Sequence, residues 1–171
     1  MSAKNKAFFL VGNYGCGKSS IIKETVTRQE SIFLEIRPNV WVVGTQINGA
    51  DSLSQFAKEN VLKTIIENKD KNVIIAGNYY CQIKDIEILN KHFNVVLVYL
   101  KTSFENNAKR IAERGKLINV DTFNNKLKTH VSMISKTNGL RKLYIIDNNQ
   151  ELKQTKQEFF NIVENEINRI S

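Results

Sequence analysis

The segment GNYGCGKSS, Gly12 to Ser20, has the residue types and spacing of a loop that binds phosphate. It fits the pattern G-x-x-x-x-G-K-[ST], in which glycines let successive backbone N–H groups point at an anion. In such loops the lysine contacts the β- and γ-phosphates and the next hydroxyl binds Mg²⁺. We therefore predict ATP and Mg²⁺ as cofactors, with Lys18 catalytic and Ser19 the metal ligand. The predicted ATP-binding residues are Gly12, Asn13, Tyr14, Gly15, Cys16, Gly17, Lys18, Ser19 and Ser20.

Motifs that are missing narrow the class of nucleotide-binding protein. The chain has no N/T-K-x-D loop of the kind that reads guanine in GTPases, and it is too short for a motor-type ATPase. The run NVIIAGNYY has Ala76 where an acidic metal-binding residue is common, followed by Gly77 and Asn78. Mg²⁺ must then depend on Ser19, phosphate oxygens, water and another carboxylate. These features favour a small kinase, and they leave Asn78 either orienting the acceptor or forming a simple turn.

Two arginines have the spacing to stabilise a phosphoryl group in transfer. Arg110 and Arg114 are one helical turn apart, so they share a helix face. Arginine supplies charge to the oxygens of the moving group and stays protonated. The layout resembles the lid arginines of nucleoside monophosphate kinases, which implies a catalytic role for both. The alternative is an exposed helix end, with Glu113 as an ion-pair partner.

A hydroxyl acceptor also needs a group that takes its proton or positions the metal. Glu35 and Asp51 are the candidates, and Glu35 falls in an alternating strand pattern where a solvent-facing carboxylate is ordinary. Asp51 lies in the turn NGADSLS, before a helix that Ser52 and Gln55 are predicted to open with a capping box. Because Ser52 already fits the cap, we predict Asp51 as a base or metal-positioning residue. The alternative is that Asp51 itself caps the helix.

The elements that must position these residues alternate between apolar strands and amphipathic helices, which predicts a parallel α/β sheet. Asn72–Gly77 and Asn94–Leu100 are near-continuous apolar runs, as in strands covered on both faces. The predicted strands are 7–11, 31–37, 40–45, 72–77, 94–100 and the run KLYII. The predicted helices with two defined ends are 18–29, 84–91, 121–137 and 151–170. One further helix is predicted to begin at residue 52, and another to run from a Thr102–Glu105 capping box to Gly115.

This pattern predicts an α/β three-layer sandwich with a mostly parallel sheet of about five strands. Strands 31–37 and 40–45 are joined at Pro38-Asn39 and form an added antiparallel β-hairpin. The chain has 171 residues and no segment with the composition of a linker, so it is predicted to be one domain. Its parts are a core over 7–146, a basic lid region over about 101–142 and a C-terminal helix over 151–170.

The positive charge is concentrated in one segment. Residues 101–142 hold ten Lys or Arg against three acidic residues, which leaves seven of the chain's net +8 charges there. A long polyanion would explain this cluster, and so would a phosphate clamp with a few solvated lysines. The charge alone does not distinguish between these two explanations.

The order of the motifs resembles a group of phage-encoded P-loop kinases that includes the 5-hydroxymethyluracil DNA kinases. The resemblance runs from about Phe8 to Gly139, through the phosphate loop, the Gly-Ala-Asp-Ser turn at Asp51, the strand ending NVIIAGNYY, KRIAERG and the segment after it. It implies an adenylate-kinase-like P-loop NTPase fold and an acceptor near Asp51. Ala76 and the proline-free stretch 118–120 depart from the group's pattern.

The resemblance also implies DNA as the acceptor. A base in duplex DNA must leave the stack to reach a buried phosphate, and the flanking backbone must be held by cations. Asn78 and Tyr79 are the further candidate acceptor-binding residues, with Tyr79 or Tyr80 stacking on a base or packing in the core. The candidate DNA-binding residues are Lys116, Lys126, Lys128, His130, Lys136, Arg141 and Lys142.

We therefore expect a kinase that transfers the γ-phosphate of ATP to a hydroxyl, foremost the 5-hydroxymethyl group of a modified pyrimidine in DNA. A kinase for a free nucleoside, nucleotide or other small metabolite is the first alternative. A non-catalytic nucleotide-binding protein is the second. Two cysteines without disulfide or metal spacing, and no apolar run near the roughly 20 residues of a membrane span, predict the cytoplasm, or the host cytoplasm for a phage protein.

Overall fold

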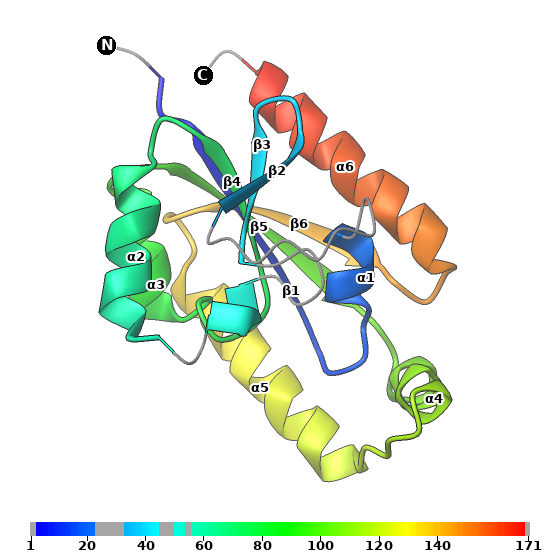
Figure 1. Cartoon of the computed structure of the whole chain (residues 1–171). Helices are drawn as coiled ribbons and strands as arrows, with labels where there is room; N and C mark the ends of the chain where they lie inside the picture. The colour runs from blue at the N-terminus through cyan, green and yellow to red at the C-terminus, as the bar shows by residue number, and fades with distance from the viewer. Residues whose placement is uncertain (1–2, 23–32, 45–49, 54–55, 170–171) are drawn as a thin grey trace.

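The computed structural model of the chain describes residues 3–22, 33–44, 50–53 and 56–169 (Figure 1). Its centre is a sheet of six described strands in the order β2-β3-β4-β1-β5-β6. All neighbours are parallel except β2 and β3, which form the antiparallel edge. The strands are β1 Lys6–Gly12, β2 Phe33–Arg37, β3 Val40–Val43, β4 Asn72–Ala76, β5 Asn94–Lys101 and β6 Lys142–Asp147.

Helices cover both faces of the sheet, which confirms the predicted three-layer α/β sandwich (Figure 1). Apolar residues of α1 and α6 pack on one face, and those of α2, α3 and α5 pack on the other. The helices are α1 Lys18–Ile22, the 3₁₀ helix η1 Ala50–Leu53, α2 Lys58–Glu67, α3 Ile83–Asn90, α4 Phe104–Glu113, α5 Val120–Lys136 and α6 Leu152–Asn168. None of the helices in the described ranges has both the length and the apolar composition to cross a membrane.

The strand β1 shows why its sequence is apolar without alternation. Phe9 and Val11 point into the cluster under α2, α3 and α5, whereas Phe8 and Leu10 point into the cluster under α1 and α6. Every residue of β1 is buried. A strand with a helix layer on each face needs apolar residues at both phases of its pleat.

The topology places the predicted phosphate-binding segment at the centre of one sheet edge. β1 pairs with β4 on one side and with β5 on the other, so the segment after β1 lies between the segments that follow β4 and β5. In open α/β sheets, ligands bind beyond the carboxyl ends of the strands at such a switch point. The site is therefore expected where the residues after β1, β4, β5 and β6 meet.

Two predicted helix starts are wrong. The helix predicted from Ser52 is divided into η1 and α2, and α2 begins at Lys58 after the N-cap residue Ala57. The helix α4 is capped by Ser103, whose side chain accepts a hydrogen bond from the backbone N–H of Asn106. Thr102 is buried instead, and its hydroxyl accepts a hydrogen bond from Asn148 Nδ2.

Other boundaries agree within a residue or two. Gly115 follows the end of α4 with φ of 74°, the left-handed conformation expected after a helix. Residues 23–32, which include most of the predicted helix 18–29, and Gln55 of the predicted capping box lie outside the described residues.

Candidate active site

The phosphate loop joins the end of β1 to the start of α1 through two glycines in left-handed conformations. Gly15 has φ of 74° and Gly17 has φ of 91°, and the turn is closed by a 3.2 Å hydrogen bond from Cys16 N to Asn13 O. A Cβ on Gly17 would lie 2.6 Å from Leu152 Cδ2, and one on Gly15 would lie 2.4 Å from Ile111 Cγ1. Only glycine satisfies both the dihedral angle and the space.

Lys18 is held against this loop by the loop's own acceptors. Its Nζ donates to Gly12 O at 2.9 Å and to Asn13 O at 3.4 Å, and it lies 3.6 Å from Cys16 Sγ. The ammonium is thus positioned beside the backbone that would surround the phosphates. Ser20 is exposed, and the backbone of Ser19 lies in α1, although its side chain is outside the described part of the structure.

Asn13 connects the phosphate loop to α5. Its buried side chain donates from Nδ2 to Phe123 O at 2.9 Å and accepts at Oδ1 from the backbone N–H of Tyr14 at 2.8 Å. Lys126 extends from the next turn of α5 over the Tyr14 ring, 5.1 Å from its centroid. The position of α5 relative to the loop is therefore defined by two specific contacts.

Asn78 follows β4 and faces the same loop. Its Nδ2 donates to Gly12 O at 3.1 Å, while its Oδ1 is buried with no hydrogen-bond partner among the described residues. In the described ranges, no group of three or more His, Cys, Asp and Glu side chains could hold a metal. An orphaned amide oxygen beside the phosphate loop fits a magnesium ion that arrives with ATP, either as a direct ligand or through water.

The two lid arginines lie in different environments. Arg110 donates to three backbone carbonyls, Cys16 O at 3.4 Å, Asn148 O at 2.9 Å and Gln150 O at 3.0 Å. Arg114 caps the C-terminal end of α4, is exposed, and lines a hollow of about 360 Å³ beside Tyr14 and Gly15. Arg110 thus joins the phosphate loop, α4 and the segment after β6, and the phosphate-contacting role of both arginines stays a prediction.

Asn148 is a site residue that the motifs did not indicate. It is fully buried after β6, and its Nδ2 donates to Cys16 O and to Thr102 Oγ1. Its Oδ1 accepts from Thr155 Oγ1 at 2.7 Å. A buried amide with all these bonds holds the phosphate loop to β5 and α6. Its position directly after the last strand, at the edge where ligands bind, is the signal that could have identified it.

A cavity of about 390 Å³ lies between the β4–α3 segment and α5. It adjoins the phosphate loop, because Asn78 lines it and donates to Gly12 O. Burial is the main cause that raises the pKa of the Cys81 thiol, and the negative charge of Asp85 raises it further. The thiol therefore stays protonated. The lining residues are Asn78, Cys81, Gln82, Ile83, Lys126, Lys128, Thr129, His130, Ser132 and Met133.

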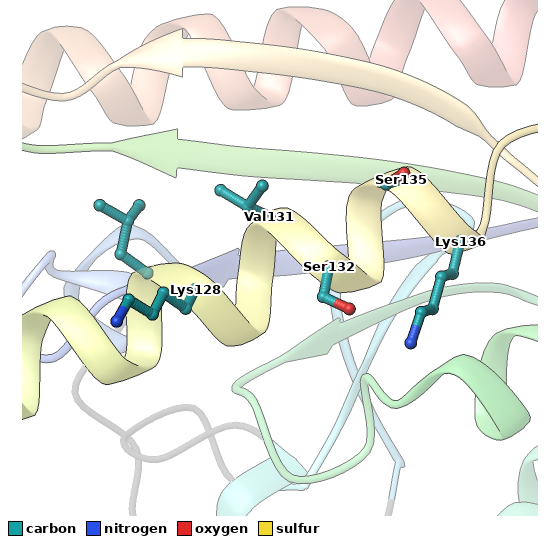
Figure 2. Close-up of a pocket in the computed structure, with 6 residues that line it drawn as sticks. Lys128, Val131, Ser132, Ser135 and Lys136 are labelled. Carbon is teal, nitrogen blue, oxygen red and sulfur yellow. The ribbon is translucent and has the colours of Figure 1, made fainter.

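A second hollow lies along α5 itself (Figure 2). Figure 2 shows Val131 on one side of the helix and Ser132 and Lys136 on the other. Lys128 and Ser132 line both this hollow and the cavity, so the two are adjacent. The residues of the hollow are Leu127, Lys128, Val131, Ser132, Ser135 and Lys136.

His130 is the buried titratable group of the cavity. Its side chain is 3% exposed, and its ring packs edge-on against Tyr99 with centroids 5.4 Å apart. Nδ1 is buried and has no hydrogen-bond partner among the described residues. Burial lowers the pKa of His130 to about 4, helped by the positive charges of Lys18 and Lys126. The ring is therefore neutral at pH 7.

The other candidate residues for the acceptor site, Asp51, Tyr79 and Glu35, are not among the described residues that line this cavity. Asp51 lies in η1, which a 2.8 Å hydrogen bond from Tyr80 OH to Leu53 O fastens to the segment after β4; the side chain of Asp51 is outside the described part. Tyr79 is 41% exposed and contacts Tyr80 edge-on, and it is not among the lining residues. Glu35 accepts a hydrogen bond from Asn39 N in the β2–β3 turn, which is a structural role.

The basic region 101–142 is only partly available to a polyanion. Arg141 donates to Ile134 O, Lys142 pairs with the buried carboxylate of Glu166 at 2.5 Å, and Arg110 binds the carbonyls described above. The exposed cations of the region are Lys101, Lys109, Arg114, Lys116, Lys128, Lys136 and Lys142.

No model of a known protein family matches the chain, and no curated protein sequence does. The solved structures that resemble the fold include a gluconokinase from Sinorhizobium meliloti 1021, a deoxyadenosine kinase from M. mycoides with bound dCTP, and a shikimate kinase from Acinetobacter baumannii with shikimate. They are 14%, 16% and 14% identical, with TM-scores of 0.51, 0.53 and 0.52. The matches cover 96%, 93% and 96% of this chain and 97%, 99% and 96% of theirs.

The predicted fold is thereby confirmed: the chain has an α/β fold similar to that of these kinases, and the predicted phosphate loop lies at the switch point of its sheet. At such low identity the likeness concerns the fold, and the chemistry must be argued from the site itself.

Proposed function

We propose that the chain is an ATP-dependent kinase that transfers the γ-phosphate to a hydroxyl group of an acceptor bound in the cavity between the β4–α3 segment and α5. The carrying observation is that Asn78 lines this cavity and donates to Gly12 O. One side chain thus spans the acceptor space and the phosphate loop. A donor phosphate and an acceptor placed on its two sides would be held for direct transfer.

In this proposal the phosphate loop binds the triphosphate of ATP through its backbone N–H groups. Lys18 leaves the carbonyls of Gly12 and Asn13 and contacts the β- and γ-phosphates. Mg²⁺ bound with ATP would neutralise phosphate charge, held by Ser19 and Asn78, with Asp51 positioning it. For Asp51 this adopts the metal-positioning role, one of the two that its sequence context suggests.

A small molecule is the acceptor that the geometry favours. The cavity of about 390 Å³ has the size of ordinary small-molecule sites. Its lining mixes amides, hydroxyls and two lysines, as a polar hydroxylated compound requires. The kinases with similar folds are named for sugar-acid, nucleoside and shikimate substrates, which supports this class.

A 5-hydroxymethyl pyrimidine in DNA is the second candidate, favoured by the exposed lysines of α4, α5 and the segment between them. A flipped base would enter the same cavity while these lysines contact the phosphates on either side. Three of the ten basic residues of region 101–142 make hydrogen bonds inside the protein, which weakens this candidate.

The test is γ-labelled ATP with Mg²⁺ against a panel of acceptors. The panel comprises free nucleosides, nucleoside monophosphates, sugar acids, 5′-hydroxyl oligonucleotides and DNA with 5-hydroxymethyl pyrimidines. Label transferred to a free compound supports the small-molecule kinase. Label in modified DNA, with affinity that falls steeply as salt rises, supports the second candidate. No transfer and no single-turnover loss of the γ-phosphate would instead show a non-catalytic nucleotide-binding protein.

A further inference from the structure

His130 lines the cavity, and its Nδ1 is buried with no hydrogen-bond partner among the described residues. The residue is only 3% exposed, and its ring packs edge-on against Tyr99. A buried polar atom without a partner costs about 1–3 kcal/mol, so such atoms are rare in folded proteins. A histidine with a purely structural role would be expected to bond through this nitrogen. A ligand that enters the cavity would supply the missing partner.

The position of His130 relative to the phosphate loop is well defined. Asn13 binds Phe123 O at the start of α5, and Lys126 lies over the Tyr14 ring one turn before His130. Lys126 and His130 are four residues apart and so share a face of α5. Burial lowers the pKa of His130, and the positive charges of Lys18 and Lys126 lower it further. Among the described residues, these two cations are the charged groups that act on it.

We propose that Nδ1 of His130 accepts a hydrogen bond from the acceptor hydroxyl and takes its proton during phosphoryl transfer. This inference rests on the kinase function proposed above. The acceptor oxygen forms a bond to the γ-phosphorus, and the bond from that phosphorus to the β,γ-bridging oxygen breaks. The electron pair of that bond leaves with ADP, and the hydroxyl proton moves to Nδ1.

The environment suits this role. At neutral pH the ring is uncharged, and the tautomer with its proton on Nε2 presents a lone pair at Nδ1. Phosphoryl transfer proceeds through a loose transition state, in which the acceptor bond to phosphorus forms late. The hydroxyl becomes strongly acidic only as that bond forms, so a weak base suffices. The role also leaves Asp51 free to position the metal.

Two substitutions of His130 separate binding from proton transfer. His130→Asn keeps a hydrogen-bond acceptor near the position of Nδ1 but is not a base, so we expect the acceptor KM to change less than about 3-fold while kcat falls about 10²-fold. His130→Leu removes both functions, so we expect KM to rise about 10-fold as well. Both should bind ATP as the wild type does.

The matched controls are His92→Asn and His92→Leu, at the chain's other histidine. His92 lies between α3 and β5, at the opposite end of the strands from the phosphate loop. Both control variants should keep wild-type kinetics. Thermal unfolding and ATP titration of each variant show whether it is folded.

Nitrogen NMR spectra of protein with isotope-labelled histidines supply a readout that does not depend on turnover. Adding the acceptor identified in the panel should shift the Nδ1 resonance of His130 and leave that of His92 unchanged. Wild-type kcat in folded His130→Asn and His130→Leu, or no shift of Nδ1 on saturation, would overturn the inference while the kinase function stood. Failure of the wild type to transfer phosphate to any acceptor would instead refute the proposed function.

Discussion

Acid should weaken this protein in the absence of nucleotide, and His130 should account for a defined part of the loss. Burial and two neighbouring lysines lower its pKa from 6.5 to about 4 in the folded state. The unfolded chain therefore binds this proton at a higher pH than the folded protein. As pH falls through 6.5 the unfolded state is stabilised by protonation, and the folded state gains the same benefit only near pH 4.

The magnitude follows from the size of the pKa difference. One pKa unit corresponds to about 1.4 kcal/mol. Between pH 7.5 and pH 5 the free energy of unfolding should fall by about 2 kcal/mol through this group, and by about 3 kcal/mol at pH 4. Below pH 4 the contribution levels off, because both states are then protonated.

The assay is urea unfolding of the wild type and of His130→Leu at a series of pH values from 7.5 to 4. The variant differs by a constant from lost contacts and keeps every other titrating group. Subtracting the two curves therefore isolates His130, and the wild type should lose about 2 kcal/mol more than the variant by pH 5. Parallel curves, or a wild type that gains stability relative to the variant on acidification, would refute the reasoning about the buried neutral ring.

Three further substitutions test the site. Lys18→Ala should lower kcat about 10²-fold or more, because it removes the cation held against the loop by Gly12 O, and steady-state kinetics should detect it. Asp51→Asn should raise the Mg²⁺ concentration for half-maximal rate while acceptor KM stays constant; unchanged Mg²⁺ dependence would end the metal-positioning role. Asn148→Ala should cost about 1–3 kcal/mol in urea unfolding and weaken ATP binding, since it leaves Cys16 O and Thr155 Oγ1 without their amide partner. Wild-type stability in that variant would show that water replaces the amide.

The strands of the sheet and the position of the predicted phosphate loop after β1 could be predicted because each depends on local patterns. Apolar runs such as 72–76 and 94–100 identify strands buried on both faces. The prediction that a helix begins at Ser52 was wrong, because a capping pattern reflects only hydrogen bonds between residues that are close in the sequence. Tyr80 OH binds Leu53 O, and η1 ends there before α2 begins.

The roles of Arg110, Asn148 and His130 depend on contacts between residues far apart in the chain. Arg110 and Cys16 are separated by 94 positions, and Asn148 and Cys16 by 132. A helical spacing shows that Arg110 and Arg114 share a helix face, but it cannot show that Arg110 donates hydrogen bonds to three backbone carbonyls. Lysine-rich composition likewise could not show that Arg141 and Lys142 bond to groups within the protein.

The sequence by itself determined the phosphate loop, because its glycines and lysine must be adjacent in the chain to enclose an anion. It also determined the alternation of strands and helices, which periodicity records directly. The tertiary structure decided which side chains face the loop from β4, α5 and the segment after β6, because the sheet brings together segments that are distant in the chain. It was the packing of α5 against Asn13 and Tyr99 that buried His130 beside the cavity, with no hydrogen-bond partner for its Nδ1 in the described part of the chain.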